Sequence, residues 1–208
     1  MTTFLSLLLQ NKILTWDNLQ RFGFIGPSIC YLCHLEVETM EHLLNNSPFS
    51  ENIWKRATLF MRRTKWVKNN IISTIRDWGY GSFKSPILNR TWKLLQGFIV
   101  WQLWKERNKR IFHSNPSPPT LLWNTIVLHL QETLHLQFWT KEDFPTHPGE
   151  LSLLNSWGFL FSHSTPPQQP RPKISKAFSP SKWLPPFQAP IRSILMAHQK
   201  EIQETHSI

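Results

Sequence analysis

The segment Cys30–Trp54, CYLCHLEVETMEHLLNNSPFSENIW, combines two cysteines and a histidine with the beginnings of two helices. Cys30 and Cys33 have the C-x-x-C spacing of a metal-binding turn. Thr39 is a typical N-cap residue, so His42 is expected in the first turn of a short helix. Position 47, which is suitable for a fourth ligand, holds a serine, and a neutral hydroxyl is a poor zinc ligand.

Two interpretations of this segment stay open at the level of its residues. Cys30, Cys33 and His42 are three good ligands for one zinc ion. Alternatively, both cysteines are buried as small hydrophobic side chains and bind no metal. Ser47 is compatible with both, because a serine before Pro48 is a good N-cap for the next helix.

Helical patterns dominate the chain before residue 140. Apolar residues recur at helical spacing, and few stretches alternate with period two, so a sheet is not indicated. The expected helices cover residues 5–13, 15–24, 47–63, 87–112 and 120–139. The expected fold class is mostly α: a small helical zinc-binding-type module, two long helices and a disordered Pro-rich tail.

The composition changes near residue 140. Ten of the 16 prolines lie after residue 139, together with many small polar residues. Such a segment buries too little apolar area to offset the entropy lost on ordering. We therefore expect a zinc-binding-like module at residues 1–65, a helical region at 66–139 and a largely disordered tail at 140–208.

The chain is strongly basic, with a formal net charge of +10, which favours an anionic partner and first of all nucleic acid. The first basic run consists of Lys55, Arg56, Arg62, Arg63, Lys65, Trp66 and Lys68. Its cations can contact phosphates and Trp66 can stack on unpaired bases, so weak, non-specific binding is expected there. The alternative is a solvated helix face.

A second basic run consists of Lys105, Arg107, Lys109 and Arg110. Here a solvated helix face is favoured, because Glu106 and Arg110 have the i,i+4 spacing of a helical ion pair. The neighbouring tryptophans are expected in the core or between helices rather than as stacking platforms. These are Trp92, Trp101 and Trp104.

Several classes of protein do not fit the sequence. No convincing secretory signal and no run of about 18 apolar residues is present, so an intracellular protein without a membrane span is expected. Nuclease and polymerase sites need clustered carboxylates, which are missing, and a zinc hydrolase would need a general base near position 47. His129, Glu132 and His135 do not have the H-E-x-x-H spacing and are expected at the solvated edge of a helix. We expect no catalytic activity.

The stretch 15–54 resembles the zinc-binding domain that follows reverse transcriptase in plant LINE-type retrotransposon polyproteins. The matching residues are Thr15, Asp17, Leu19, Cys30, Cys33, Glu38, Thr39, His42, Leu43, Pro48, Phe49 and Trp54. VWQLWKERNKRIF at 100–112 resembles a downstream W-x-x-W-x-x-RN-x-x-x-F segment of the same polyproteins. WLPP at 183–186 resembles the linker before their RNase H domain.

This resemblance implies that Cys30, Cys33 and His42 are zinc ligands, with Ser47 in the place of the family's fourth ligand, a cysteine. The flanking polymerase and RNase H domains of the family are not found in this sequence, so an isolated fragment is expected. The implied function is that of a non-catalytic, zinc-binding and nucleic-acid-associated remnant. The alternative is a metal-free helical remnant with an interaction or structural role.

Overall fold

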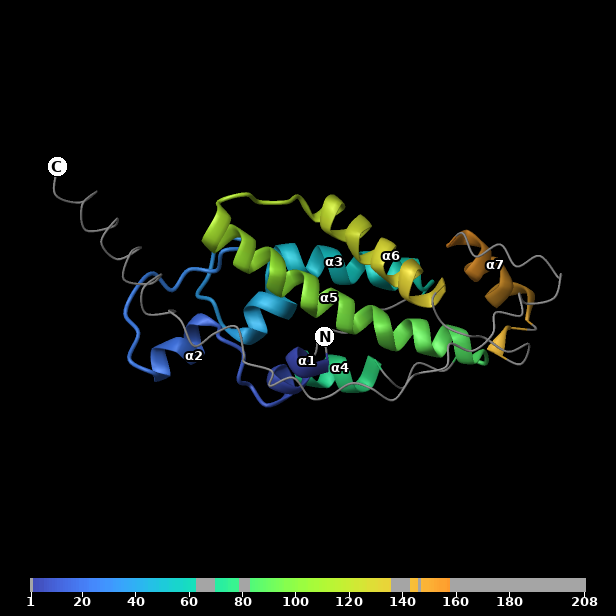
Figure 1. Ribbon diagram of the computed structural model, residues 1–208, viewed down its shortest axis with the longest axis horizontal. Helices are drawn as coiled ribbons and strands as arrows, with labels where there is room; N and C mark the ends of the chain where they lie inside the picture. The colour runs from blue at the N-terminus through green and yellow to red at the C-terminus, as the bar shows by residue number, and fades with distance from the viewer. Residues whose placement is uncertain (1, 63–69, 79–82, 136–142, 146, 158–208) are drawn as a thin grey trace, which may run out of the picture. The chain divides into compact units, whose positions relative to one another are not determined.

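The computed structural model describes residues 2–62, 70–78, 83–135, 143–145 and 147–157, which belong to one compact unit spanning Met1–Ser162. The chain is mostly helical there, as predicted (Figure 1). The helices are α1 (Thr2–Leu9), α2 (Trp16–Arg21), the π-helix η1 (His42–Asn46), α3 (Pro48–Phe60), α4 (Ile71–Trp78), α5 (Pro86–His113), α6 (Pro119–His135) and α7 (Pro148–Ser156). Within these ranges the β-type pairing is a single isolated bridge between Ile29 and Val37.

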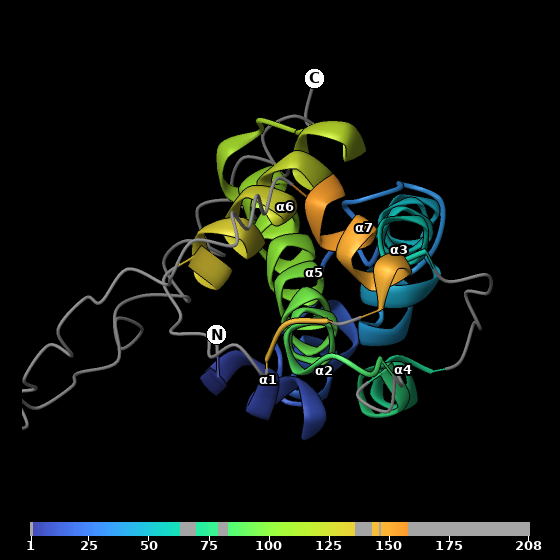
Figure 2. The same cartoon turned by 90° about the vertical axis from the view of Figure 1, so that its right-hand side faces the viewer.

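Helix α5 is the central element of the fold. It packs against α3, α4, α6 and η1, and Figures 1 and 2 show it running between them. Its predicted apolar stripe forms the core, and every member is buried: Leu88, Trp92, Leu95, Ile99 and Leu103. Pro86 lies at the first turn after the N-cap Ser85, and Ser114 ends the helix in a left-handed conformation, φ 48°.

Helix α3 begins as the sequence indicates. The Ser47 side chain accepts a hydrogen bond from the backbone N–H of Ser50, 3.1 Å, and Pro48 occupies the first turn. Its end was predicted wrongly, because the helix stops at Phe60 instead of continuing to residue 63. Arg62 has φ 50°, a left-handed conformation that terminates a right-handed helix.

Two helices were not predicted. One is α4, and the other is α7, which lies within the range 140–208 that was assigned to the tail. Pro148 opens α7 after the N-cap His147, and Leu153 and Leu154 are buried. Trp157 follows and stacks on Phe60 of α3, with 4.6 Å between the ring centroids. The rest of the predicted tail, residues 158–208, lies outside the described residues.

Among the described helices, none is both long enough and apolar enough to cross a bilayer.

Candidate metal centre

The C-x-x-C segment forms a tight turn held by backbone hydrogen bonds. The Cys30 N–H donates to the carbonyl of Glu36, 2.8 Å, and the Glu38 N–H donates to that of Ser28, 2.7 Å. Within the turn, the His34 N–H donates to the Cys30 carbonyl, 2.8 Å, and His34 adopts φ 57°. The chain therefore reverses direction immediately after Cys33 and brings both cysteines to one end of the turn.

The structure places Cys30, Cys33 and His42 together. Their sulfur and nitrogen ligand atoms all lie within 4.8 Å of one another, and His42 Nε2 lies 3.1 Å from Cys33 Sγ. Cys30 and His42 are buried and Cys33 is half-buried. Two thiols and an imidazole are the donor set that zinc prefers, so the group fits a zinc ion by its chemistry and could hold a metal.

His42 is held both at its backbone and at its ring. The backbone N–H of His42 donates to Oγ1 of Thr39, the predicted cap, at 3.0 Å. Its Nδ1 lies 3.1 Å from the Glu36 carboxylate. A carboxylate at Nδ1 favours the proton on that nitrogen, which leaves the lone pair of Nε2 directed at the sulfurs.

Glu36 was not identified from the sequence. An acidic residue between a C-x-x-C pair and a histidine is too common to be a signal. Its position opposite Nδ1 depends on the turn geometry, which the sequence pattern does not reveal. The arrangement matches the carboxylate–histidine pairs that support zinc ligands in proteins.

Ser47 is fully buried, and its hydroxyl is used by helix α3. It accepts a hydrogen bond from the Ser50 N–H and donates one to Ser50 Oγ, 2.8 Å. The Ser47 N–H donates to the His42 carbonyl, 2.7 Å, which closes the i→i+5 turn of η1. This π-type turn places residue 47 one helical turn after residue 42.

Burial controls the charge on the Cys30 sulfur. It raises the pKa of the Cys30 thiol to about 12, although the backbone N–H groups of Leu32 and Cys33 donate to the sulfur and oppose that rise. Without a cation, Cys30 is therefore a neutral thiol at neutral pH. A divalent metal ion would supply the charge that stabilises the thiolate.

Two arginines of α5 support the segment around the turn. Arg107 Nη2 lies 2.7 Å from Glu38 Oε1, and Arg107 Nε lies 3.1 Å from Glu38 Oε2, so the two side chains form a bidentate ion pair. Arg110 Nη1 donates to the carbonyls of Tyr31 and Leu32, the residues between the two cysteines.

These contacts correct the interpretation of the second basic run. The predicted pair between Glu106 and Arg110 forms, at 2.9 Å, but the side chains are only 2% and 12% exposed, so it is not part of a solvated face. Arg107 is buried as well. Sequence spacing indicated the pair but gave no sign of its burial, because the groups that cover it come from distant parts of the chain.

The first basic run is described only in part. Lys55 is exposed and lies 3.5 Å from Glu51, Arg56 donates to the Asn52 side chain, and Arg62 is exposed beyond the end of α3. The remaining members, Arg63, Lys65, Trp66 and Lys68, lie outside the described residues. Because α3 ends at Phe60, the run does not follow one continuous helix.

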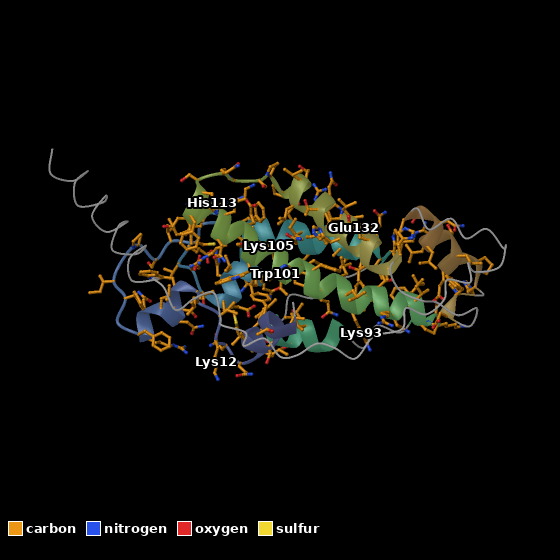
Figure 3. All side chains as sticks on the ribbon, viewed as in Figure 1. Lys12, Lys93, Trp101, Lys105, His113 and Glu132 are labelled. Carbon is orange, nitrogen blue, oxygen red and sulfur yellow. The ribbon has the colours of Figure 1, made fainter. Side chains whose placement is uncertain are left out.

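The predicted core role of the α5 tryptophans is confirmed. Trp92 is buried, and the rings of Trp101 and Trp104 lie 5.1 Å and 5.9 Å from that of Phe4. Figure 3 shows Trp101 beside Lys105, whose ammonium lies 5.7 Å from the Trp101 ring.

The three residues of interest on α6 do not form a metal site. His129 is half-buried, whereas Glu132 and His135 are exposed, as predicted. In the part of the chain that the structure describes, the group with metal-binding geometry is that of Cys30, Cys33 and His42.

Comparison with known proteins adds two findings. Residues 1–54 match the family described as zinc-binding in reverse transcriptase. The chain is also 26% identical over 115 residues to the "Putative ribonuclease H protein" of Arabidopsis thaliana, an alignment that covers 54% of this chain and 18% of that protein. No solved structure matches the chain.

Proposed function

We propose that residues 1–54, which match the family described as zinc-binding in reverse transcriptase, derive from a retrotransposon polyprotein, and that the chain binds one zinc ion through Cys30, Cys33 and His42. The observation that carries the proposal is the convergence of two sulfurs and one imidazole nitrogen within 4.8 Å. Glu36 supports it, because its carboxylate lies 3.1 Å from Nδ1 of His42 and leaves Nε2 as the nitrogen that faces the sulfurs.

The role of the metal would be structural. Zinc held by these residues joins the C-x-x-C turn to the start of η1, where the two free cysteines make no disulfide. A water molecule or a neighbouring side chain would complete the coordination. The relative's name refers to a ribonuclease H, but the aligned part is a small fraction of that protein, and we propose no catalytic activity for this chain.

Replacing Ser47 by cysteine is expected to tighten zinc binding at least about tenfold, because a thiolate replaces a weak oxygen donor at the family's fourth ligand position. The metal-free variant should lose about 1 kcal/mol of stability, because Ser47 is the N-cap of α3. Chelator competition measures the affinity, and elemental analysis of the purified protein should give at most one zinc per chain.

A matched control is Ser73→Cys, which adds a thiol at the start of α4, where the Ser73 side chain donates to Asn70. That variant should leave the zinc affinity unchanged. Equal affinities for wild type and Ser47→Cys would show that position 47 does not face the metal. A wild-type chain purified without zinc would instead favour the metal-free helical remnant.

We also propose that the first basic run binds nucleic acid weakly and without sequence preference. The net charge of +10 and the exposure of Lys55 and Arg62 support this. The contact between Lys55 and Glu51 offsets part of the charge, so the contribution is expected to come mainly from residues beyond α3. Trp66 would favour single strands, because only unpaired bases are free to stack on it.

The triple substitution of Arg62, Arg63 and Lys65 by alanine is expected to weaken this binding and to flatten the salt dependence. Each phosphate contact contributes roughly one unit to the slope of log affinity against log salt, so the slope should fall by up to about three. Fluorescence anisotropy with a single-stranded oligonucleotide at several salt concentrations measures both quantities.

The control removes three exposed lysines outside the run, Lys12, Lys84 and Lys93; Lys12 and Lys93 are labelled in Figure 3. It changes the net charge equally, so a specific contribution of the run appears as a difference between the two triple variants. Equal slopes for both variants would mean that the binding depends only on the net charge of the chain and not on the first basic run.

A further inference from the structure

We infer that Arg110, on α5, is a positioning residue for the metal centre, which it reaches through two peptide groups of the C-x-x-C turn. This inference rests on the proposed zinc binding by Cys30, Cys33 and His42. It assigns a role in metal binding to a residue that lies outside the matched family segment, residues 1–54.

The guanidinium of Arg110 is fixed on all sides. Its Nη1 donates to the carbonyls of Tyr31, 3.1 Å, and Leu32, 2.9 Å. Its Nε donates to Glu106 and its Nη2 to the carbonyl of Ser117, 3.0 Å. The guanidinium carbon also lies 4.6 Å from the centroid of the Phe49 ring. With these partners the side chain has one geometry.

The two carbonyls that Arg110 holds belong to the peptide groups that face the Cys30 sulfur. The carbonyl of Tyr31 shares a planar peptide group with the N–H of Leu32, and the carbonyl of Leu32 shares one with the N–H of Cys33. Both of these N–H groups donate hydrogen bonds to the sulfur of Cys30. The guanidinium and the sulfur therefore lie at opposite ends of the same two peptide dipoles.

This arrangement fixes the two peptide groups between the cysteines from the side of α5. The same contacts fix the direction of the two N–H groups and hence the position of the sulfur relative to Cys33 and His42. Groups that orient metal ligands in this way typically change the affinity 10–100-fold.

The test compares Glu106→Gln with the double variant Glu106→Gln/Arg110→Gln. Removing Arg110 alone would leave the buried Glu106 carboxylate without its ion-pair partner, and the Glu106→Gln background avoids this. A glutamine at 106 can still accept from the Ser117 N–H, as the glutamate does at 2.6 Å. Lys105→Gln serves as a control for the loss of one cation from the exposed side of α5.

Zinc affinity by chelator competition and the absorption spectrum of the cobalt(II)-substituted protein are the two readouts. We expect the double variant to bind zinc about 10–100-fold more weakly than Glu106→Gln. We also expect its thiolate–cobalt absorption bands to shift, with the same helix content by circular dichroism. Lys105→Gln should match the wild type in both readouts.

Affinities within twofold of each other and identical cobalt spectra for the two Glu106→Gln variants would overturn this inference alone. A wild-type chain that binds no zinc would overturn the proposed function and the inference with it. If the double variant does not fold, Arg110→Lys replaces it. A lysine keeps the charge but cannot hold both carbonyls together with Glu106 and Ser117, so wild-type affinity and spectrum in that variant would also overturn the inference.

Discussion

Replacing Arg107 by methionine is expected to lower the free energy of unfolding by about 3–5 kcal/mol, because it leaves a buried carboxylate without its counterion. The side chains of Arg107 and Glu38 are only 8% and 1% exposed. The two buried side chains form two hydrogen bonds with each other. Glu38 also accepts a hydrogen bond from the backbone N–H of Trp16, 3.1 Å. The Trp16 N–H alone cannot compensate a buried negative charge.

Urea denaturation measures this loss, with the midpoint and the slope fitted separately. The double variant Glu38→Gln/Arg107→Met should recover most of the stability, because no unpaired charge remains. Lys55→Met, which breaks the exposed pair with Glu51, should change the stability by less than about 1 kcal/mol. A similarly small effect of Arg107→Met would mean that water reaches the Glu38 carboxylate.

Trp54→Ala is expected to be equally damaging, with a loss of about 3–5 kcal/mol. Trp54 is fully buried in the core, and its indole N–H donates to the Leu44 carbonyl in η1, 2.8 Å. The substitution leaves a cavity next to the helix that carries His42 and leaves the Leu44 carbonyl without this donor. We therefore expect zinc binding to weaken in the same variant.

Trp54→Phe largely separates the two contributions, because it keeps most of the ring volume and removes the hydrogen bond to Leu44. It should cost about 1–3 kcal/mol, the penalty for an unsatisfied buried acceptor. Leu59→Ala is the control on the same helix, since Leu59 is 75% exposed and should contribute little. A loss below about 1 kcal/mol for Trp54→Ala would contradict the buried position of the indole.

The features that the sequence predicts correctly are local ones. Ser47 as the cap of α3 and Thr39 as the cap of the segment carrying His42 depend on residues three or fewer positions away. The apolar stripe of α5 depends on spacing within one helix. In the same way, the short distance along the chain between Cys30 and Cys33 made their convergence predictable.

The features that the sequence did not predict depend on distant partners. Arg107 and Glu38 are 69 residues apart, and their charges give no sign that both are buried. The end of α3 was missed for another reason, because Arg62 adopts a left-handed conformation that its residue type does not favour. Both errors concern basic residues, and both made the charged surface look more regular in the sequence than it is.

The distance along the chain between Arg110 and the turn also has a consequence during protein synthesis. The Tyr31 carbonyl and its donor are 79 residues apart, so the C-x-x-C turn leaves the ribosome well before α5 exists. At roughly 5–20 residues per second, the interval is about 4–16 seconds. During that time the cysteines of the nascent chain are available to metal ions and oxidants without the contacts of Arg110 to the turn.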